Sequence, residues 1–442
     1  MMQAWLATWR ERVYRWHPEA IDGSIYFAAA VFAALTYVIS AHGDYRQWAE
    51  IALGFYLGAA LISVVHSRRA RPSPGRLRGM RLAVFATVAL GAAVAPLATA
   101  VILQAKQGGT VHAQPEVTVV EAAAHRLYVG KDPYLGPPPG HRALTAPAGT
   151  PAYEEYFPYL PGMVAFGVAH STSAPQALTD PRVLFITAVL FMALLALLFS
   201  AARGESRIRA LQLLTVLPTA ALPLATGGDD LPVIGLMVLG LVFLQRRWPV
   251  AAGLVLGAGA SLKFTAWPLL VLAVFAAWDK SGHWAIGRYA AAAAAVIVPT
   301  VVPFAIENPL AFVDNVVRFP LGLAGVGSPA RSPLPGHWFV TAFPSLRGMF
   351  TVVVLVAGTV ILGQYLLRHT PRRASEVAAI CGWMMALGIA LAPATRFGYF
   401  IYPVTLLTWS LVLRSEPSSV NFGDAARLRS ARVASQSGVV IS

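Results

Sequence analysis

Residues 183–201 read VLFITAVLFMALLALLFSA, a run without a charged side chain. An α-helix needs about 17–25 predominantly apolar residues to cross the hydrocarbon core of a bilayer, and this run is long enough. The strands of a membrane β-barrel alternate apolar and polar residues instead, which neither this run nor Ala290–Val298 does. The stretch therefore predicts a membrane-spanning helix.

The rest of the chain has the same character. Of its 442 residues, 57% are hydrophobic and 12% are charged, with a mean hydropathy of +0.61, whereas a soluble protein carries about 25% charged residues. We therefore expect an all-α, polytopic integral membrane protein with about twelve membrane-spanning helices. The apolar segments are 24–42, 47–66, 82–104, 183–201, 210–226, 231–245, 248–262, 264–278, 289–306, 348–367, 376–395 and 397–413.

The basic residues indicate how the chain is oriented. The net charge of +14 does not predict a nucleic-acid partner, because the arginines gather in short loops between apolar runs. With the N-terminus inside, 23 of the 34 Lys and Arg residues fall on the cytoplasmic side and 11 on the outer side. By the positive-inside rule, we expect a multi-pass plasma-membrane protein with both termini in the cytoplasm. Arg10, Arg12 and Arg15 precede the first segment without a cleavage signal, which is typical of a retained end.

Three regions follow from this arrangement. We expect residues 1–81 to hold a cytoplasmic N-terminus and an extra helical hairpin, residues 82–413 the main transmembrane domain, and residues 414–442 a disordered, basic cytoplasmic tail. Two long loops, 105–156 and 307–347, face outward, and long loops are often functional. Segment 157–170 is apolar but short for a crossing, so we expect a re-entrant or lip segment on the outer face. The single cysteine, Cys381, lies in an apolar run, which excludes a disulfide framework.

The first outer loop contains a charged, helix-patterned stretch, EVTVVEAAAHRLYVGKDPYL at 116–135. Pro115 suits the first turn of a helix, and Glu116 beside it suits the positive end of the helix dipole. Apolar side chains recur on one face at Val117, Val120, Ala124 and Leu127, and polar ones on another at Glu121, His125, Tyr128 and Asp132. The pattern predicts an amphipathic helix, ended near Gly130, that lies on the outer membrane surface. An interfacial helix with ordinary surface charges would show the same pattern.

Several stretches resemble a known family. An acidic residue soon after a crossing, followed by an alanine-rich helix and G-x-D-P-Y at 130–134, resembles the first outer loop of GT-C membrane glycosyltransferases. Within that superfamily the chain is most similar to glycosyltransferase family 87, the polyprenyl-phosphate-mannose-dependent α-mannosyltransferases of actinobacteria. The further matching stretches are FPYLP (157–161), TGGDDLP (226–232), GLVLGAGASLKFTAWP (253–268) and APATRFGYFIYP (392–403). The resemblance runs from about residue 82 to 413 and makes this region a GT-C-like catalytic domain.

The resemblance implies a reaction and a set of roles. The protein would transfer a sugar, mannose in the family, from a polyprenyl-phosphate donor to a glycolipid or glycan acceptor on the outer face, with inversion. The acidic base of the family's loop, usually Asp, falls at Glu116, and Glu121 is its rival because it could pair with His125 one turn along. Lys263 and Arg396 would contact the donor phosphate; the alternative is that each cation only marks a helix end at headgroup depth.

The remaining candidates are substrate-binding residues. Asp229 and Asp230 lie at membrane depth, where carboxylates are costly and tend to be functional. They could bind acceptor hydroxyls, cap the helix begun at Leu231, or coordinate a divalent cation. A divalent cation is thus the one cofactor left open, and no residue is predicted as a metal ligand. The other candidates for substrate contact are His125, Tyr134, Tyr159 and His337.

Two other classes of function fit a chain of this composition. A transporter or lipid flippase would show inverted repeats with broken helices that meet at the midplane. No repeat is evident, and the charged residues lie toward one face. A non-catalytic assembly protein is the third alternative, and it predicts that the outer carboxylates matter to no activity.

The orientation can be tested with two introduced cysteines. We expect Gly140→Cys to react with a membrane-impermeant thiol reagent in intact cells, and Ser73→Cys to react only after the cells are opened. The reason is that the two positions lie in loops of opposite charge bias. Labelling of Ser73→Cys from outside would contradict the orientation.

Overall fold

The computed structural model of the chain describes residues 18–68, 74–107, 113–135, 151–172, 174–200, 205–278, 282–324, 326 and 328–414. The described residues are helical or irregular and form no strand; one isolated bridge pairs Arg331 with Thr395. The expected cytoplasmic N-terminus (1–17), the tail after residue 414, Ser73 and Gly140 lie outside the described residues. The all-α class is confirmed.

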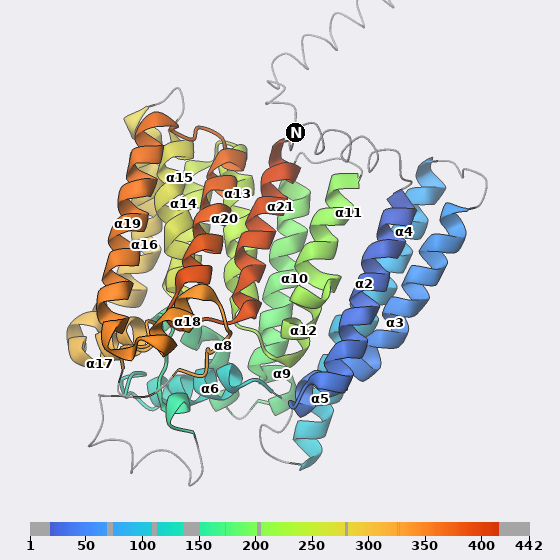
Figure 1. The fold of residues 1–442 in the computed structure, drawn as a ribbon, viewed down its shortest axis with the longest axis horizontal. Helices are drawn as coiled ribbons and strands as arrows, with labels where there is room; N and C mark the ends of the chain where they lie inside the picture. Colours follow the sequence, from blue (N-terminus) through green and yellow to red (C-terminus); the bar gives the residue numbers. More distant parts are fainter. Residues whose placement is uncertain are drawn as a thin grey trace, which may run out of the picture.

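The chain forms a bundle of long helices that is closed at one end by short ones (Figure 1). The long elements are α2 (Pro18–Ile39), α3 (Gly43–Ser67), α4 (Pro74–Ala89) continued by η1 (Leu90–Val94) and α5 (Ala95–Gln107), α10 (Pro181–Phe199), α11 (Glu205–Leu211) with η5 (Gln212–Val216), α12 (Pro218–Thr226), α13 (Asp230–Gln245), α14 (Pro249–Leu262), α15 (Trp267–Ala277), α16 (His283–Glu307), α19 (Arg347–Arg368), α20 (Ala374–Leu391) and α21 (Ile401–Arg414). The short elements are α6 (Pro115–Tyr128), η2 (Ala152–Glu155), η3 (Pro161–Val164), α8 (Ala165–Val168), η4 (Ala169–Ser171), α9 (Gln176–Thr179), η6 (Phe264–Ala266), α17 (Pro309–Val313), η7 (Asp314–Arg318), α18 (Pro335–Ala342), η8 (Pro344–Leu346) and η9 (Phe397–Phe400).

Each of the twelve expected apolar segments forms a helix, but not all are long enough to span alone. Within the described part of the chain, seven helices have the length and hydropathy to cross a membrane, or eight if the pair 208–216 and 218–226, bent by 41°, is one span. Helices α13, α14 and the segment Phe264–Ala277 are apolar but shorter than that. The expectation of about twelve full-length spans is therefore not met by helix length alone.

The short apolar helices lie inside the bundle. Helix α13 is buried on every side, from Leu231 to Leu244, and packs against α10, α14, α15, α20 and α21. A helix that is apolar all round is expected in such a central position. Helix α19 shows the opposite arrangement: only 6% of its apolar window is buried, which suits a helix with a face toward lipid.

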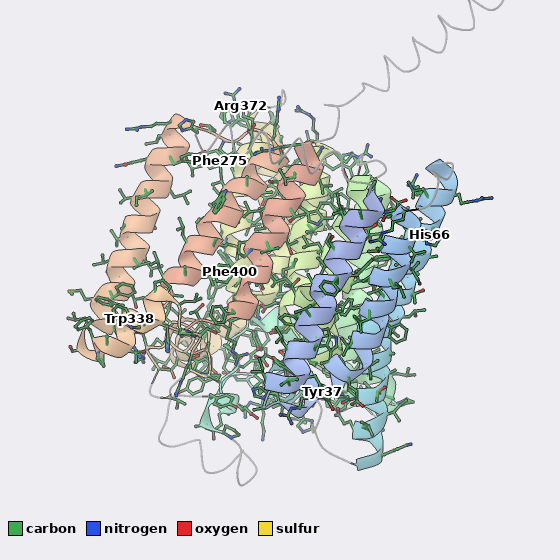
Figure 2. The ribbon with its side chains drawn as sticks, turned by 45° about the vertical axis from the view of Figure 1, so that its right-hand side comes forward. Tyr37, His66, Phe275, Trp338, Arg372 and Phe400 are labelled. Atoms are coloured by element: carbon green, nitrogen blue, oxygen red, sulfur yellow. The ribbon has the colours of Figure 1, made fainter. Side chains whose placement is uncertain are left out.

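The short elements gather at one end of the bundle. Figure 1 shows α6, α8, α17 and α18 together at the end opposite the start of α2. Figure 2 likewise places Arg372 and Phe275 at one end of the bundle and Tyr37 and Trp338 toward the other. Residues 157–170, expected as a re-entrant or lip segment, form η3, α8 and part of η4 beside α6 and no spanning helix.

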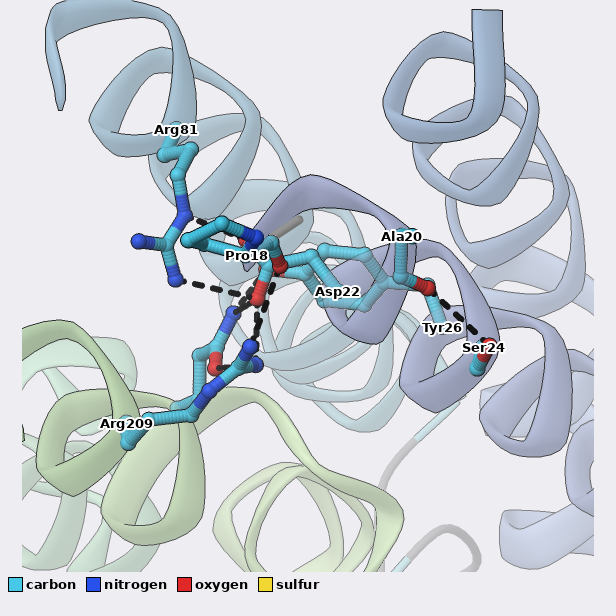
Figure 3. Close-up of polar contacts among 8 residues, drawn as sticks. Pro18, Ala20, Asp22, Ser24, Tyr26, Arg81 and Arg209 are labelled. Atoms are coloured by element: carbon cyan, nitrogen blue, oxygen red, sulfur yellow. Dashed lines mark hydrogen bonds and ion pairs between the residues drawn. The ribbon is translucent and has the colours of Figure 1, made fainter. Parts of the chain in front are cut away.

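A buried polar cluster joins the N-terminal hairpin to the rest of the bundle (Figure 3). The carboxylate of Asp22 accepts hydrogen bonds from Arg81 Nε at 2.5 Å and from Gln212 Nε2 at 2.9 Å, and it also accepts one from Arg209. Gln212 donates to the hydroxyl of Tyr26 at 3.0 Å as well. One carboxylate on α2 thus connects α4, α11 and η5 at the end of the bundle opposite α6.

This cluster predicts a large loss of stability in Asp22→Asn. Removing one partner of a buried ion pair leaves an uncompensated charge and costs about 3–5 kcal/mol, and the Arg81 and Asp22 side chains are only 2% and 4% exposed. We expect a clear drop in the thermal unfolding midpoint of the detergent-purified protein. Glu50→Gln, which removes the charge of an exposed carboxylate on α3, is the matched control and should change the midpoint little. Equal midpoints for Asp22→Asn and wild type would contradict a stabilising role for the cluster.

Candidate active site

Helix α6 carries the leading acidic candidate and has the predicted bounds. It begins at Pro115 after an extended N-cap, Gln114, and it ends before Gly130, whose φ of +75° is a conformation that favours glycine. The backbone N–H of Gln114 donates to Thr226 O at 2.8 Å, and its side chain donates to Thr226 Oγ1 at 2.7 Å. The first turn of α6 is thereby anchored to the end of α12.

The apolar face of α6 packs onto the end of the bundle. Val117, Val120 and Ala124 are fully buried, as their spacing predicts. The neighbouring α8 approaches so closely at Gly167 that an added Cβ would lie 2.7 Å from the Cβ of Ala124. Helices α6 and α8 therefore pack closely against each other.

Glu116 meets Arg396, which lies in the loop between α20 and α21. The guanidinium Nη1 of Arg396 donates to Glu116 Oε1 at 2.5 Å, across 280 positions of sequence. The second carboxylate oxygen of Glu116 is buried and has no hydrogen-bond partner among the residues that the structure describes. The loop that carries Arg396 is itself held in place, because Thr395 N donates to Ala330 O at 3.0 Å and Ser332 N donates to Thr395 O at 2.9 Å.

Lys263 binds both predicted aspartates. Its ammonium donates to Asp229 Oδ1 at 2.8 Å and to Asp230 Oδ1 at 2.6 Å, and Asp230 also accepts from the Tyr402 hydroxyl at 2.7 Å. The Lys263 side chain is only 12% exposed, so it does not extend toward solvent as a snorkelling lysine would. Asp229 is the N-cap residue of α13 and Asp230 lies in its first turn, but in the described structure the Asp229 side chain makes no capping hydrogen bond, so capping by the Asp229 side chain is wrong.

Two tyrosines lie between these ion pairs. The Tyr159 ring centroid is 4.8 Å from Lys263 Nζ, a cation–π contact. Burial raises the pKa of Tyr399 to about 12, with Arg396 opposing the shift and Asp230 reinforcing it. Groups from both ion pairs therefore act on one side chain, and we treat them as one unit, the charged site: Glu116, Asp229, Asp230, Lys263 and Arg396.

The charged site holds three carboxylates against two cations. Burial raises the pKa of Asp229 to about 6; Lys263 opposes this shift, while the charges of Asp230 and Glu116 reinforce it. Within the described ranges, one oxygen of Asp229 is buried without a hydrogen-bond partner, as is one of Glu116. Buried acceptors of this kind are costly to leave unpaired, so they favour a ligand that donates hydrogen bonds, such as a hydroxyl.

Glu121 belongs to a separate cluster. Its carboxylate lies 3.7 Å from His170 Nε2, and burial raises its pKa to about 7, with Asp180 reinforcing and Arg182 opposing the shift. The expected pairing with His125 is wrong, because α8 and η4 fold back over α6 and bring His170 to the carboxylate; His125 is exposed. Neither Lys263 nor Arg396 appears among the charges that shift Glu121.

The other predicted contacts have supporting positions. The Tyr134 hydroxyl is buried and donates to Tyr159 O at 2.8 Å, so this tyrosine supports the charged site and does not line it. His337 Nδ1 lies 2.9 Å from Pro393 O, next to the loop of Arg396, while Trp338 is exposed. Tyr399 and Tyr402 were missed as candidates, although both occur in the stretch APATRFGYFIYP; the signal was their position one and two turns after Arg396.

No metal site is evident at the charged site. Among the residues that the structure describes, no three His, Cys, Asp or Glu side chains come together as a metal ion would require. Asp229 and Asp230, which could have held a divalent cation, share the ammonium of Lys263 instead. A cation there would have to displace this lysine.

Comparisons with known proteins add one structural likeness. No protein-family model matches the chain, and no curated protein matches it. The crystal structure of ArnT from Cupriavidus metallidurans bound to undecaprenyl phosphate is similar, with a TM-score of 0.46 and 15% sequence identity. The match covers 78% of this chain and 61% of that one, so the chain spans less than two thirds of the length of ArnT.

The raised pKa of Glu121 predicts a pH-dependent contribution to stability. The folded-state pKa of about 7 lies above the ordinary value of 4.5, so the folded protein binds the extra proton between these values, and stability is lost as the pH rises through them. We expect the thermal unfolding midpoint of the wild type minus that of Glu121→Gln to decrease between pH 5 and pH 8. A constant difference between the two proteins across this range would contradict the assignment.

Proposed function

We propose that the protein is an integral membrane glycosyltransferase that moves a sugar, mannose by the family resemblance, from a polyprenyl-phosphate donor to a glycolipid or glycan acceptor on the outer face of the plasma membrane. The contact between Glu116 and Arg396 carries the proposal. The contact joins the acidic residue of the stretch 116–135 to the cation of the stretch 392–403 at one end of the apolar bundle. In the sequence, only the family resemblance connects these two stretches.

The chemistry of such a donor suits this site. In the transfer step, the acceptor oxygen bonds to C1 of the sugar while the bond from C1 to the phosphate oxygen breaks, and its electron pair leaves with the phosphate. The acceptor hydroxyl proton passes to the carboxylate of Glu116. The leaving phosphate needs no proton, so the reaction requires one base and positive charge near the phosphate.

The remaining residues have roles that follow from their contacts. Arg396, whose side chain is 33% exposed, would bind the donor phosphate. Lys263 has three N–H donors, of which two reach the aspartates, and we assign the third to a phosphate oxygen. The unpaired oxygen of Asp229 would accept a hydrogen bond from a sugar hydroxyl, and the Tyr159 ring would border the sugar.

The position of the charged site favours an enzyme over a transporter. Coupling sites of transporters lie near the bilayer midplane, where broken helices meet. Here α6 lies across one end of the bundle (Figure 1), and the charged residues come from that helix and from the ends of α12, α14 and α20. A lipid-linked donor could reach such a site with its chain still in the membrane.

Substitution of Glu116 tests the proposal. Purified protein incubated with radiolabelled polyprenyl-phosphate mannose and membrane glycolipids should transfer label to the glycolipids. A general base contributes about 10²–10⁴-fold to rate, so Glu116→Gln should lower turnover by that order, because glutamine keeps the size and hydrogen bonding but cannot take the proton.

The matched control is Glu121→Gln, which makes the same change on the same helix outside the charged site. It should cost much less turnover. Loss of activity in Glu121→Gln with near-normal activity in Glu116→Gln would exchange their roles. Absence of label transfer by the wild-type protein would contradict the proposed function itself.

A further inference from the structure

Both cations of the charged site already bind carboxylates. Arg396 contacts Glu116, and Lys263 contacts Asp229 and Asp230. A phosphate that enters this site meets three carboxylates and two cations that are already paired. The third N–H of Lys263, which we assigned to a phosphate oxygen, gives it one contact, and it gains a full ion pair only when it takes a cation from its present partner.

Arg396 is the cation that can be taken. Lys263 is shared by two carboxylates and is 12% exposed, and Asp230 is held further by Tyr402. Within the part of the chain that the structure describes, Arg396 contacts one carboxylate; its side chain is 33% exposed and it lies in a loop between two helices. Its planar guanidinium has five N–H donors and matches the geometry of a phosphate. Exchange of one partner at Arg396 is therefore easier than exchange of two at Lys263.

We propose that the donor phosphate and Glu116 compete for Arg396, so that binding of the donor releases the carboxylate that serves as the base. This inference rests on the proposed function and adds a control step to it. While the site is empty, the guanidinium of Arg396 occupies Oε1 of Glu116. Once a donor phosphate takes the guanidinium, that oxygen is free to accept the proton of the acceptor hydroxyl.

The competition has a consequence that a purely structural ion pair would not have. Removal of the Glu116 charge should make phosphate binding stronger, although it abolishes turnover. A charge-assisted hydrogen bond that is freed for the ligand corresponds to about tenfold or more in affinity. If the pair served only to hold α6 in place, Glu116→Gln would leave the affinity unchanged or weaken it.

The test is titration of undecaprenyl phosphate into the full-length protein in lipid nanodiscs by calorimetry. We expect Glu116→Gln to bind it about tenfold or more tightly than wild type, and Arg396→Ala to bind it more weakly. The double variant Glu116→Gln/Arg396→Ala should bind like Arg396→Ala, because the gain acts through the guanidinium. Arg396→Lys keeps the positive charge and serves in place of Arg396→Ala if that variant does not fold.

The matched control is Glu154→Gln. Glu154 lies on η2, near enough for the charge of Glu116 to raise its pKa, and no ion pair joins it to Arg396 in the described residues. Removing its charge should change affinity by less than about threefold. An equal gain in Glu154→Gln and Glu116→Gln, or no gain in Glu116→Gln, would overturn the competition even where wild type transfers label. If neither wild type nor any variant binds undecaprenyl phosphate, the proposed function falls with it.

Discussion

A protein backbone within the hydrocarbon of a membrane has only itself for hydrogen bonding, and this constraint determines where the chemistry of this molecule can lie. The helices that cross the bundle satisfy their own N–H and C=O groups, and apart from the break at Leu217 the irregular backbone of the described residues lies at helix ends. The residues of the charged site all come from such places: the first turn of α6, the junctions after α12 and α14, and the loop before α21. Helix α6 then covers this end, with its apolar face down.

Buried charges lie in ion-paired clusters at both ends of the bundle. At the end opposite α6, Asp22 gathers two arginines and joins the N-terminal hairpin to α4 and α11. At the α6 end, one oxygen each of Glu116 and Asp229 is buried without a hydrogen-bond partner among the described residues. The Asp22 cluster stabilises the fold, whereas the unpaired acceptors of the charged site keep a cost that a ligand can remove.

Local patterns in the sequence predicted much of the fold and many of the site residues. The twelve apolar segments all form helices, and α6 has the bounds that Pro115 and Gly130 indicate. Whether an apolar segment is long enough to span the membrane alone was less predictable. A helix such as α13, which is buried within the bundle, is as apolar as a helix that faces lipid. Hydropathy cannot distinguish burial in protein from burial in lipid.

Pairings across the chain could not be predicted. The spacing of Glu121 and His125 suggested a contact along one helix, but the carboxylate meets His170, which a turn after α8 brings back. Asp229 looked like a helix cap, and only the end of α14, 34 positions on, shows that its partner is Lys263. The contact of Glu116 with Arg396 spans 280 positions, and no local pattern contains it.

The central claim is that Arg396 passes from Glu116 to the donor phosphate. A cryo-electron microscopy structure in nanodiscs with undecaprenyl phosphate bound, compared with one without it, tests this most directly. The account predicts that the guanidinium contacts Glu116 in the empty protein and a phosphate oxygen in the complex, with the Glu116 carboxylate separated from Arg396. A phosphate bound elsewhere, with the contact between Glu116 and Arg396 intact, would contradict it.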